Sequence, residues 1–113
     1  MTEPTTRPRR IDGARLADEI ASHDTLLVQF YTEGCTLCAS MEPVLDNVVR
    51  ETGVDAVLVN PRDAAGLVER HRITSVPTLA LFRDGEELAR LADGFVAGDR
   101  LTSFLADNGF DGA

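Results

Sequence analysis

Residues 26–38 read Leu-Leu-Val-Gln-Phe-Tyr-Thr-Glu-Gly-Cys-Thr-Leu-Cys. The apolar run 26–31 is typical of a buried β-strand, and the pattern that begins at the cysteines is typical of a helix. A Cys-x-x-Cys pair at the start of a helix can close a small disulfide ring with little backbone movement. The helix N-terminus also favours the thiolate of the first cysteine over its thiol. Cys35 and Cys38, the two cysteines of the chain, therefore predict a dithiol–disulfide redox site.

The same cysteine pair is also half of a tetrahedral zinc site, which needs two further ligands. The two histidines, His23 and His71, are separated from the pair and from each other, without the spacing of a zinc motif. Zinc or an iron–sulfur cluster held across a dimer stays open as an alternative. A structural disulfide is disfavoured, because so short a loop removes little entropy from the unfolded chain. We expect no cofactor and no metal.

The composition is that of one globular domain. The chain has 113 residues, of which 43% are hydrophobic, and this is enough for a packed core that does not depend on disulfides or bound metals. Its apolar stretches are all shorter than the ~20 residues of a membrane span, and the N-terminus has no apolar signal region. We therefore expect a cytoplasmic protein that does not enter the membrane. In that compartment a Cys-x-x-Cys pair is usually catalytic, redox-sensing or metal-binding.

The charge balance is strongly acidic. Acidic residues number 19 and basic residues 11, all of them arginine, which gives a net charge of −8 at pH 7. This argues against nucleic acid as a partner, because phosphate binding needs a basic face. Two explanations fit an acidic, lysine-free chain: a protein kept soluble in concentrated salt, or a GC-rich genome that favours arginine codons. We favour the halophilic origin, and we expect a monomer.

The rest of the chain alternates helical and strand-like patterns. Residues 1–10 are polar and contain proline, which predicts a flexible tail. Asp12 predicts the N-cap of a helix over 13–22. Further helices are expected over 35–50, after a cap at Asp63, and over 98–107; strands are expected at 26–31, 56–59, 78–82 and 86–92, the last two joined by an Asp-Gly turn. One domain is predicted over 11–109, with a short tail at 110–113. The element order predicts an α/β fold, a central mixed sheet with helices on both faces.

The chain resembles the thioredoxin family over residues 11–108. The resemblance rests on the strand that leads into Cys35-Thr36-Leu37-Cys38, on Val76-Pro77-Thr78, and on Gly94 before the last helix. A Cys-x-x-Cys motif alone is weak, but this combination is highly specific. The resemblance implies the thioredoxin fold, with four to five strands and about four helices. It also implies a thiol–disulfide oxidoreductase that acts on protein disulfides and serves cellular redox balance.

The resemblance assigns roles to matching residues. Cys35 resembles the exposed attacking cysteine, and Cys38 resembles the buried cysteine that resolves the mixed disulfide. Val76 and Pro77, with a cis bond between them, match the loop that pairs with the substrate backbone. Gly94 matches a glycine that lets the substrate approach closely. The substrate groove implied in this way comprises Gly34, Thr36, Leu37, Val76, Pro77 and Gly94. The implied electron donor is a thioredoxin-reductase-type enzyme or another dithiol donor.

Four departures from the family pattern indicate a divergent member. Thr36-Leu37 replaces the Gly-Pro that is typical between the cysteines, and Gly34 replaces an aromatic residue. Gln29 stands where the family has a buried aspartate, and Leu58 stands where it has the partner lysine. A neutral amide cannot act as a general base, so Gln29 predicts slower chemistry.

Glu33, next to the motif, is expected to oppose the Cys35 thiolate by like charge. His71, near the end of a short helix, is expected to be solvated or to face the helix dipole. The competing functional class is a redox-inert module that keeps only the peptide groove of the fold.

Overall fold

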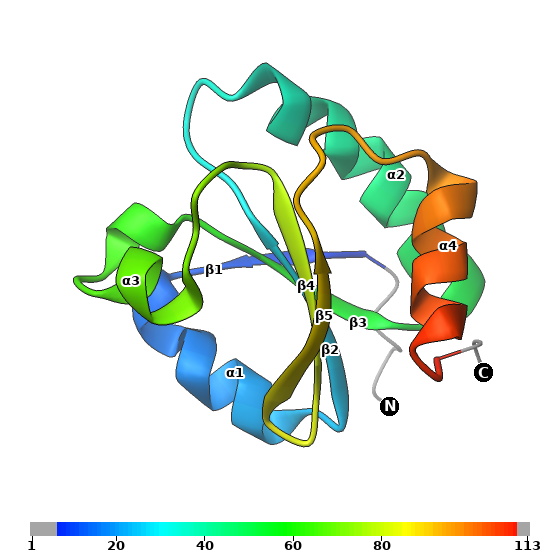
Figure 1. Ribbon diagram of the computed structural model, residues 1–113, viewed down its shortest axis with the longest axis horizontal. Coiled ribbons are helices and arrows are strands. Elements are labelled where there is room, and N and C mark those ends of the chain that lie inside the picture. Colours follow the sequence, from blue (N-terminus) through cyan, green and yellow to red (C-terminus); the bar gives the residue numbers. More distant parts are fainter. Residues whose placement is uncertain (1–6, 111–113) are drawn as a thin grey trace.

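The computed structural model describes residues 7–110, and within them one mixed sheet has the strand order β1-β3-β2-β4-β5. Helices cover both faces of this sheet (Figure 1). The strands are β1 (Arg9–Ile11), β2 (Thr25–Phe30), β3 (Asp55–Val59), β4 (Thr78–Arg83) and β5 (Glu86–Leu91), and the helices are α1 (Leu16–Ser22), α2 (Thr36–Thr52), α3 (Leu67–His71) and α4 (Gly98–Asp107). The predicted α/β architecture is confirmed, with the larger of the two expected strand numbers.

Strand β2 lies at the centre of the sheet. It runs parallel to β3, with Val28 opposite Val57, and antiparallel to β4, with Val28 opposite Ala80. The parallel pair needs a crossover, which α2 supplies. Strands β4 and β5 form the predicted hairpin, with a register shift at Leu81/Phe82. Its turn residues Asp84 and Gly85 have φ values of 52° and 87°, the left-handed geometry that a two-residue type I′ turn requires at both positions.

The sheet separates two hydrophobic cores, because successive side chains of a strand point to opposite faces. Residues of α2 and α4 fill one core against β2 and β4, with Leu27, Met41, Leu45, Leu81, Leu101, Phe104 and Leu105 among its members. Residues of α1 and α3 fill the other, with Leu16, Ile20, Val28, Phe30, Leu67 and Phe82 among its members. Each core excludes water from one side of β2, the strand that leads to the cysteines.

Helix α2 begins directly after Cys35, which is its N-cap, and ends at Thr52. Gly53 terminates it with φ 77°, a conformation that glycine adopts without a steric penalty. Pro43 lies inside the helix. Because α2 packs on the sheet along its length, the cysteines at its start are fixed relative to β2.

The predicted N-terminal tail is wrong at its end. Arg9 and Arg10 belong to β1 and pair with Val57 and Leu58 of β3. Both side chains form ion pairs, Arg9 with Glu19 at 2.8 Å and Arg10 with Glu42 at 2.5 Å. The sequence does not predict this strand, because a three-residue segment that begins with two arginines shows no alternation of apolar and polar residues. Residues 1–6 of the predicted tail lie outside the part of the chain that the structure describes.

The predicted C-terminal tail also begins too early. Phe110 packs against the core under α2 and α4. Its backbone N–H donates to the Leu105 carbonyl at 2.8 Å, which closes the end of α4. Residues 111–113 lie outside the described chain.

Two capping predictions have different outcomes. The Asp12 side chain does cap a helix start, because it accepts from the Ala14 N–H at 2.9 Å, but the first turn is a 3-10 turn at Gly13–Arg15 that precedes α1. The prediction for Asp63 is wrong, since α3 follows Gly66 without a side-chain cap. The Asp63 carboxylate instead accepts from the Gly13 N–H at 3.4 Å and joins two turns that are distant in sequence.

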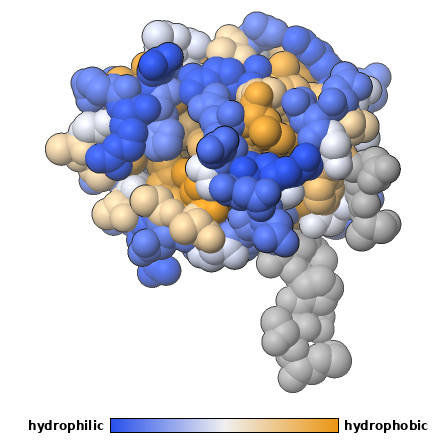
Figure 2. All heavy atoms as spheres, turned by 60° about the horizontal axis from the view of Figure 1, so that its bottom comes forward, coloured by the Kyte–Doolittle hydropathy of each residue, from blue (hydrophilic) through white to orange (hydrophobic). Residues whose placement is uncertain are grey.

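No helix among residues 7–110 is both long and apolar enough to cross a membrane. On the face shown in Figure 2, hydrophilic side chains cover most of the surface and leave only limited hydrophobic patches between them. This agrees with the acidic composition of the chain.

His71 corrects another expectation, because its ring is half-buried rather than solvated. It packs against Phe30, with ring centroids 5.4 Å apart, and against Phe82, with centroids 6.1 Å apart. Burial lowers the pKa of His71 below its ordinary value; Glu87 opposes this effect, and Arg70 and Arg90 add to it. The neutral imidazole is therefore the form that fits the folded protein.

Stability should consequently fall as the pH drops through the histidine range. Below a pH of about 6.5 the unfolded chain binds a proton at His71, whereas the folded chain resists protonation. The contribution of neutral His71 to the free energy of unfolding is therefore largest above that pH and decreases below it. We expect this contribution to be small, because the ring is only partly buried and solvent screens its charge. Urea unfolding at pH 7.5 and 5.5 should show a smaller loss for His71→Phe than for the parent. An equal loss in both would contradict the assignment.

Candidate active site

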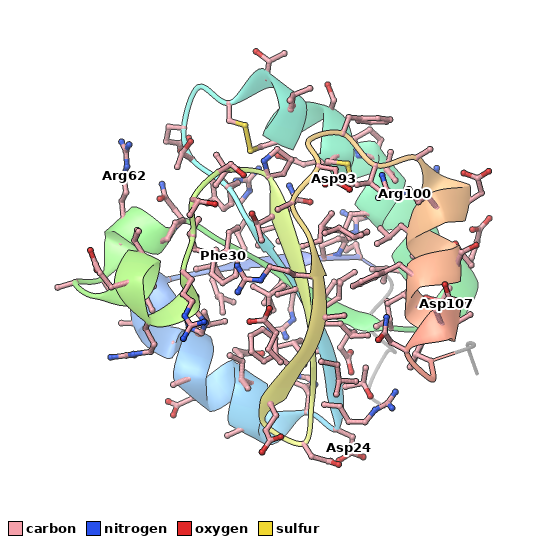
Figure 3. All side chains as sticks on the ribbon, in the orientation of Figure 1. Asp24, Phe30, Arg62, Asp93, Arg100 and Asp107 are labelled. Carbon is pink, nitrogen blue, oxygen red and sulfur yellow. A yellow bond between two sulfur atoms is a disulfide. The ribbon has the colours of Figure 1, made fainter. Side chains whose placement is uncertain are left out.

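The two cysteines meet where β2 leads into α2. Their Cα atoms are 5.2 Å apart, and their sulfur atoms are joined in a disulfide. The yellow sulfur–sulfur bond lies at the top of Figure 3, at the start of α2. The predicted strand–loop–helix arrangement of Cys35 and Cys38 is therefore present.

Cys35 caps α2. Its Sγ accepts a hydrogen bond from the Cys38 N–H at 3.1 Å, and its side chain is partly exposed. The positive end of the helix dipole and this N–H both stabilise negative charge on sulfur. The position favours a Cys35 thiolate when the disulfide is reduced.

Cys38 lies one turn inside the helix, in a different environment. Cys38 is 3% exposed, so a molecule in solution reaches Cys35 more easily than Cys38. Low exposure opposes a charged sulfur because a buried charge loses its hydration. The two cysteines are thus unequal in access and in polarity.

The segment before β4 faces Cys35 across the site. The Val76 carbonyl oxygen lies 3.9 Å from Cys35 Sγ. The Val76–Pro77 peptide bond is cis, as the resemblance implied. Thr78 Oγ1 donates to the Ser75 carbonyl at 2.7 Å and holds the loop at this bend. A segment that is distant in sequence is therefore placed directly against the first cysteine.

A second loop places Gly94 beside the motif. Gly94 has φ 83°, and a Cβ at this position would lie 3.5 Å from Leu37 Cδ1. Leu37 and the adjacent Phe95 are each 47% exposed, which is high for large apolar side chains. Phe95 was not predicted from the sequence; the available signal was an aromatic residue directly after the glycine, outside any amphipathic helix.

Helix α2 also holds this second loop. The buried Val96 N–H donates to Met41 Sδ at 3.3 Å, and both residues are at most 1% exposed. Met41 lies one turn beyond Cys38, so the cysteines and the Gly94 loop share one rigid support. No sequence pattern predicts a thioether as the acceptor.

Gln29 lies beneath the pair, as expected. Its side chain is fully buried, and its Nε2 donates to the Cys38 carbonyl at 3.4 Å. Its neighbours across the sheet are Leu58 of β3 and Leu79 of β4. The amide is a polar group beside the second cysteine in an otherwise apolar register of the sheet.

The remaining residues of the motif are exposed. Gly34 has φ 78°, in the left-handed region that glycine adopts without a steric penalty. Thr36 and Glu33 are both exposed. The expected influence of Glu33 on Cys35 stays a prediction.

Among residues 7–110, no group of three or more histidine, cysteine or acidic side chains is arranged to hold a metal ion. His23 contacts Glu19 and Asp55, each at 3.2 Å, and His71 packs against aromatic rings. Within one copy, neither histidine serves the cysteine pair.

Comparisons with known proteins agree with this geometry. The family model Thioredoxin matches residues 9–107. A thioredoxin of Chlamydia trachomatis is 37% identical over 85 residues, covering 71% of this chain and 78% of that protein. A thioredoxin of Echinococcus granulosus is 29% identical over 93 residues, covering 81% and 87%. The solved structure of a mutant thioredoxin from Halobacterium salinarum NRC-1 superposes with a TM-score of 0.84 at 26% identity, covering 95% of both chains.

The family match spans most of the chain and includes the Cys-x-x-Cys pair at disulfide distance. Fold, cysteine geometry and relatives therefore point to the same chemistry, the exchange of thiols and disulfides. The chain belongs to the thioredoxin family and is a thiol–disulfide oxidoreductase.

Proposed function

We propose that the chain reduces protein disulfides, with Cys35 as the attacking residue and Cys38 as the resolving residue. The observation that carries the assignment is their unequal placement: Cys35 is partly exposed and accepts an N–H at the helix start, whereas Cys38 is 3% exposed. A nucleophile needs access and a stabilised thiolate. A resolving cysteine needs only to reach its neighbour.

The reaction then has two exchanges. The Cys35 thiolate attacks a substrate disulfide, forms a mixed disulfide and expels one substrate thiolate. Cys38, after losing its proton, attacks Cys35 Sγ; the Cys35–Cys38 disulfide forms and the second substrate thiolate leaves. Two electrons pass from the protein dithiol to the substrate. Both substrate sulfurs finally take protons from solvent or from neighbouring acids.

The proposed substrate groove comprises Gly34, Thr36, Leu37, Val76, Pro77 and Gly94. Its support is that the Val76 carbonyl lies against Cys35 and the Gly94 loop lies against Leu37, so an extended peptide could pair with the Val76 backbone. Leu37 and Phe95 add exposed apolar surface at the rim. Such a surface favours substrates with apolar residues near the target cysteine.

Renewed turnover needs an electron donor, for which we propose a thioredoxin-reductase-type enzyme or another dithiol. A cytoplasmic location belongs to the same proposal, because reducing thiol systems operate in that compartment. The acting species proposed is a monomer, since one copy contains both cysteines and both loops that flank them.

A reduction assay tests this function. The purified protein, with dithiothreitol as donor, should accelerate reduction of a disulfide-linked fluorescent protein substrate above the rate of dithiothreitol alone. Cys35→Ser should return the rate to that background. A parent rate equal to the background would instead support a redox-inert peptide-binding module. Stoichiometric zinc or iron in protein purified under reducing conditions would support a metal site.

A further inference from the structure

One buried polar atom near the cysteines has no hydrogen-bond partner. Among the buried side-chain nitrogen and oxygen atoms of residues 7–110, Gln29 Oε1 alone is in this position. A buried acceptor without a donor costs free energy, and native proteins rarely leave one without a reason. The atom belongs to a fully buried side chain that is hydrogen-bonded to Cys38.

The orientation of this amide follows from its other contact. The Cys38 carbonyl can only accept a hydrogen bond, so the NH2 group of Gln29 must face it and Oε1 must face elsewhere. Leu58 and Leu79, opposite Gln29 in the sheet, have no side-chain donor to offer. In the disulfide form, Oε1 therefore stays unsatisfied by protein groups of the described chain.

Reduction creates a new hydrogen-bond donor on Cys38, the residue that the Gln29 side chain already contacts. Two electrons and two protons convert the disulfide into two thiols, and the S–S bond breaks. Cys35 Sγ already has polar neighbours: it accepts from the Cys38 N–H at 3.1 Å, and the Val76 carbonyl oxygen lies 3.9 Å away. Cys38 is 3% exposed, so its thiol hydrogen needs an acceptor inside the protein.

We propose that Gln29 Oε1 accepts a hydrogen bond from the Cys38 thiol in the reduced protein and thereby favours the dithiol over the disulfide. Gln29 is a positioning and tuning residue, and this role rests on the proposed redox function. The hydrogen bond exists in one redox state only, so its free energy enters the redox equilibrium directly. An amide suits the role because it accepts a thiol hydrogen without taking the proton itself.

The test measures the dithiol–disulfide equilibrium of Cys35 and Cys38 in glutathione buffers at pH 7. In these buffers two glutathione thiols supply the electrons and become glutathione disulfide. Gln29→Met keeps the length and shape of the side chain but has no amide oxygen. Its equilibrium constant should shift roughly two- to five-fold towards the disulfide, the range expected from one hydrogen bond made by a weak thiol donor.

A second measurement separates this role from ordinary packing. Gln29→Met should destabilise the reduced protein more than the oxidised protein in urea unfolding, and the difference should match the shift in the redox equilibrium. A merely structural role would lower both stabilities equally. Thr52→Val is the matched control, because it removes buried hydrogen bonds at the far end of α2 and should leave the equilibrium unchanged.

Equal equilibrium constants for the parent and Gln29→Met would overturn the inference, as would a shift towards the dithiol. These outcomes would leave the proposed function intact, because both proteins would still exchange with glutathione. A parent whose cysteines fail to exchange with glutathione would overturn the proposed function and this inference with it.

Discussion

Cys38→Ser should lose turnover and accumulate as a covalent complex with its protein substrate. Cys35 can still attack, because its exposure and its place at the start of α2 do not depend on the sulfur of Cys38. The mixed disulfide then lacks the thiol that would release it. Non-reducing electrophoresis should show a stable one-to-one adduct, and multiple-turnover reduction should fall to the uncatalysed rate.

Cys35→Ser is the matched control for this experiment. It keeps one thiol, but that thiol is buried, so it should form little or no adduct under the same conditions. If Cys35→Ser traps substrates better than Cys38→Ser, the roles of the two cysteines are reversed. Peptide mapping of the adduct then identifies which sulfur is joined to the substrate.

Phe30→Ala should cause a severe loss of stability. Phe30, labelled in Figure 3, is fully buried at the end of β2, in the core under α1 and α3. Its ring also contacts the ring of His71. Removing a buried aromatic ring costs about 3–5 kcal/mol, because the lost transfer energy is combined with a cavity that collapses only in part. Urea unfolding of the oxidised protein measures this difference.

Phe95→Ala is the control, since it removes the same atoms from a side chain that is 47% exposed. Its effect on the free energy of unfolding should stay within about 0.5 kcal/mol, as is usual at a surface position. A loss below about 1 kcal/mol for Phe30→Ala would mean that the core repacks around the missing ring.

The sequence predicts the elements that have a strong local pattern. The continuous apolar run of β2, the periodicity of α2 and the Asp84-Gly85 turn are all in place, and the last helix has its expected bounds. Strand β1 has no such pattern, because its pairing with β3 and its ion pairs come from residues distant in sequence. Asp63 does not cap a helix, because its carboxylate accepts a hydrogen bond from the Gly13 backbone, which is also distant in sequence.

The site divides in a similar way. The spacing of the cysteines predicts a redox pair, but Val76, Pro77 and Gly94 were identified through the family resemblance and not through periodicity. Gln29 was expected near the pair, yet its unsatisfied oxygen emerges only from the three-dimensional surroundings. The support of the Gly94 loop by Met41 likewise depends on packing that no local pattern encodes.

The two outer strands of the sheet bear on how copies of the chain behave when crowded. A free strand edge offers unpaired N–H and C=O groups to a neighbouring molecule, which is how sheets fuse and aggregates begin. Here β1 is only three residues long and starts with two arginines, while β5 carries Glu86, Glu87 and Arg90 and adjoins a register shift in its pairing with β4. Short, charged or distorted edges discourage strand addition. With a net charge of −8 adding mutual repulsion, crowded copies should remain separate, each with its cysteine pair free to meet other proteins.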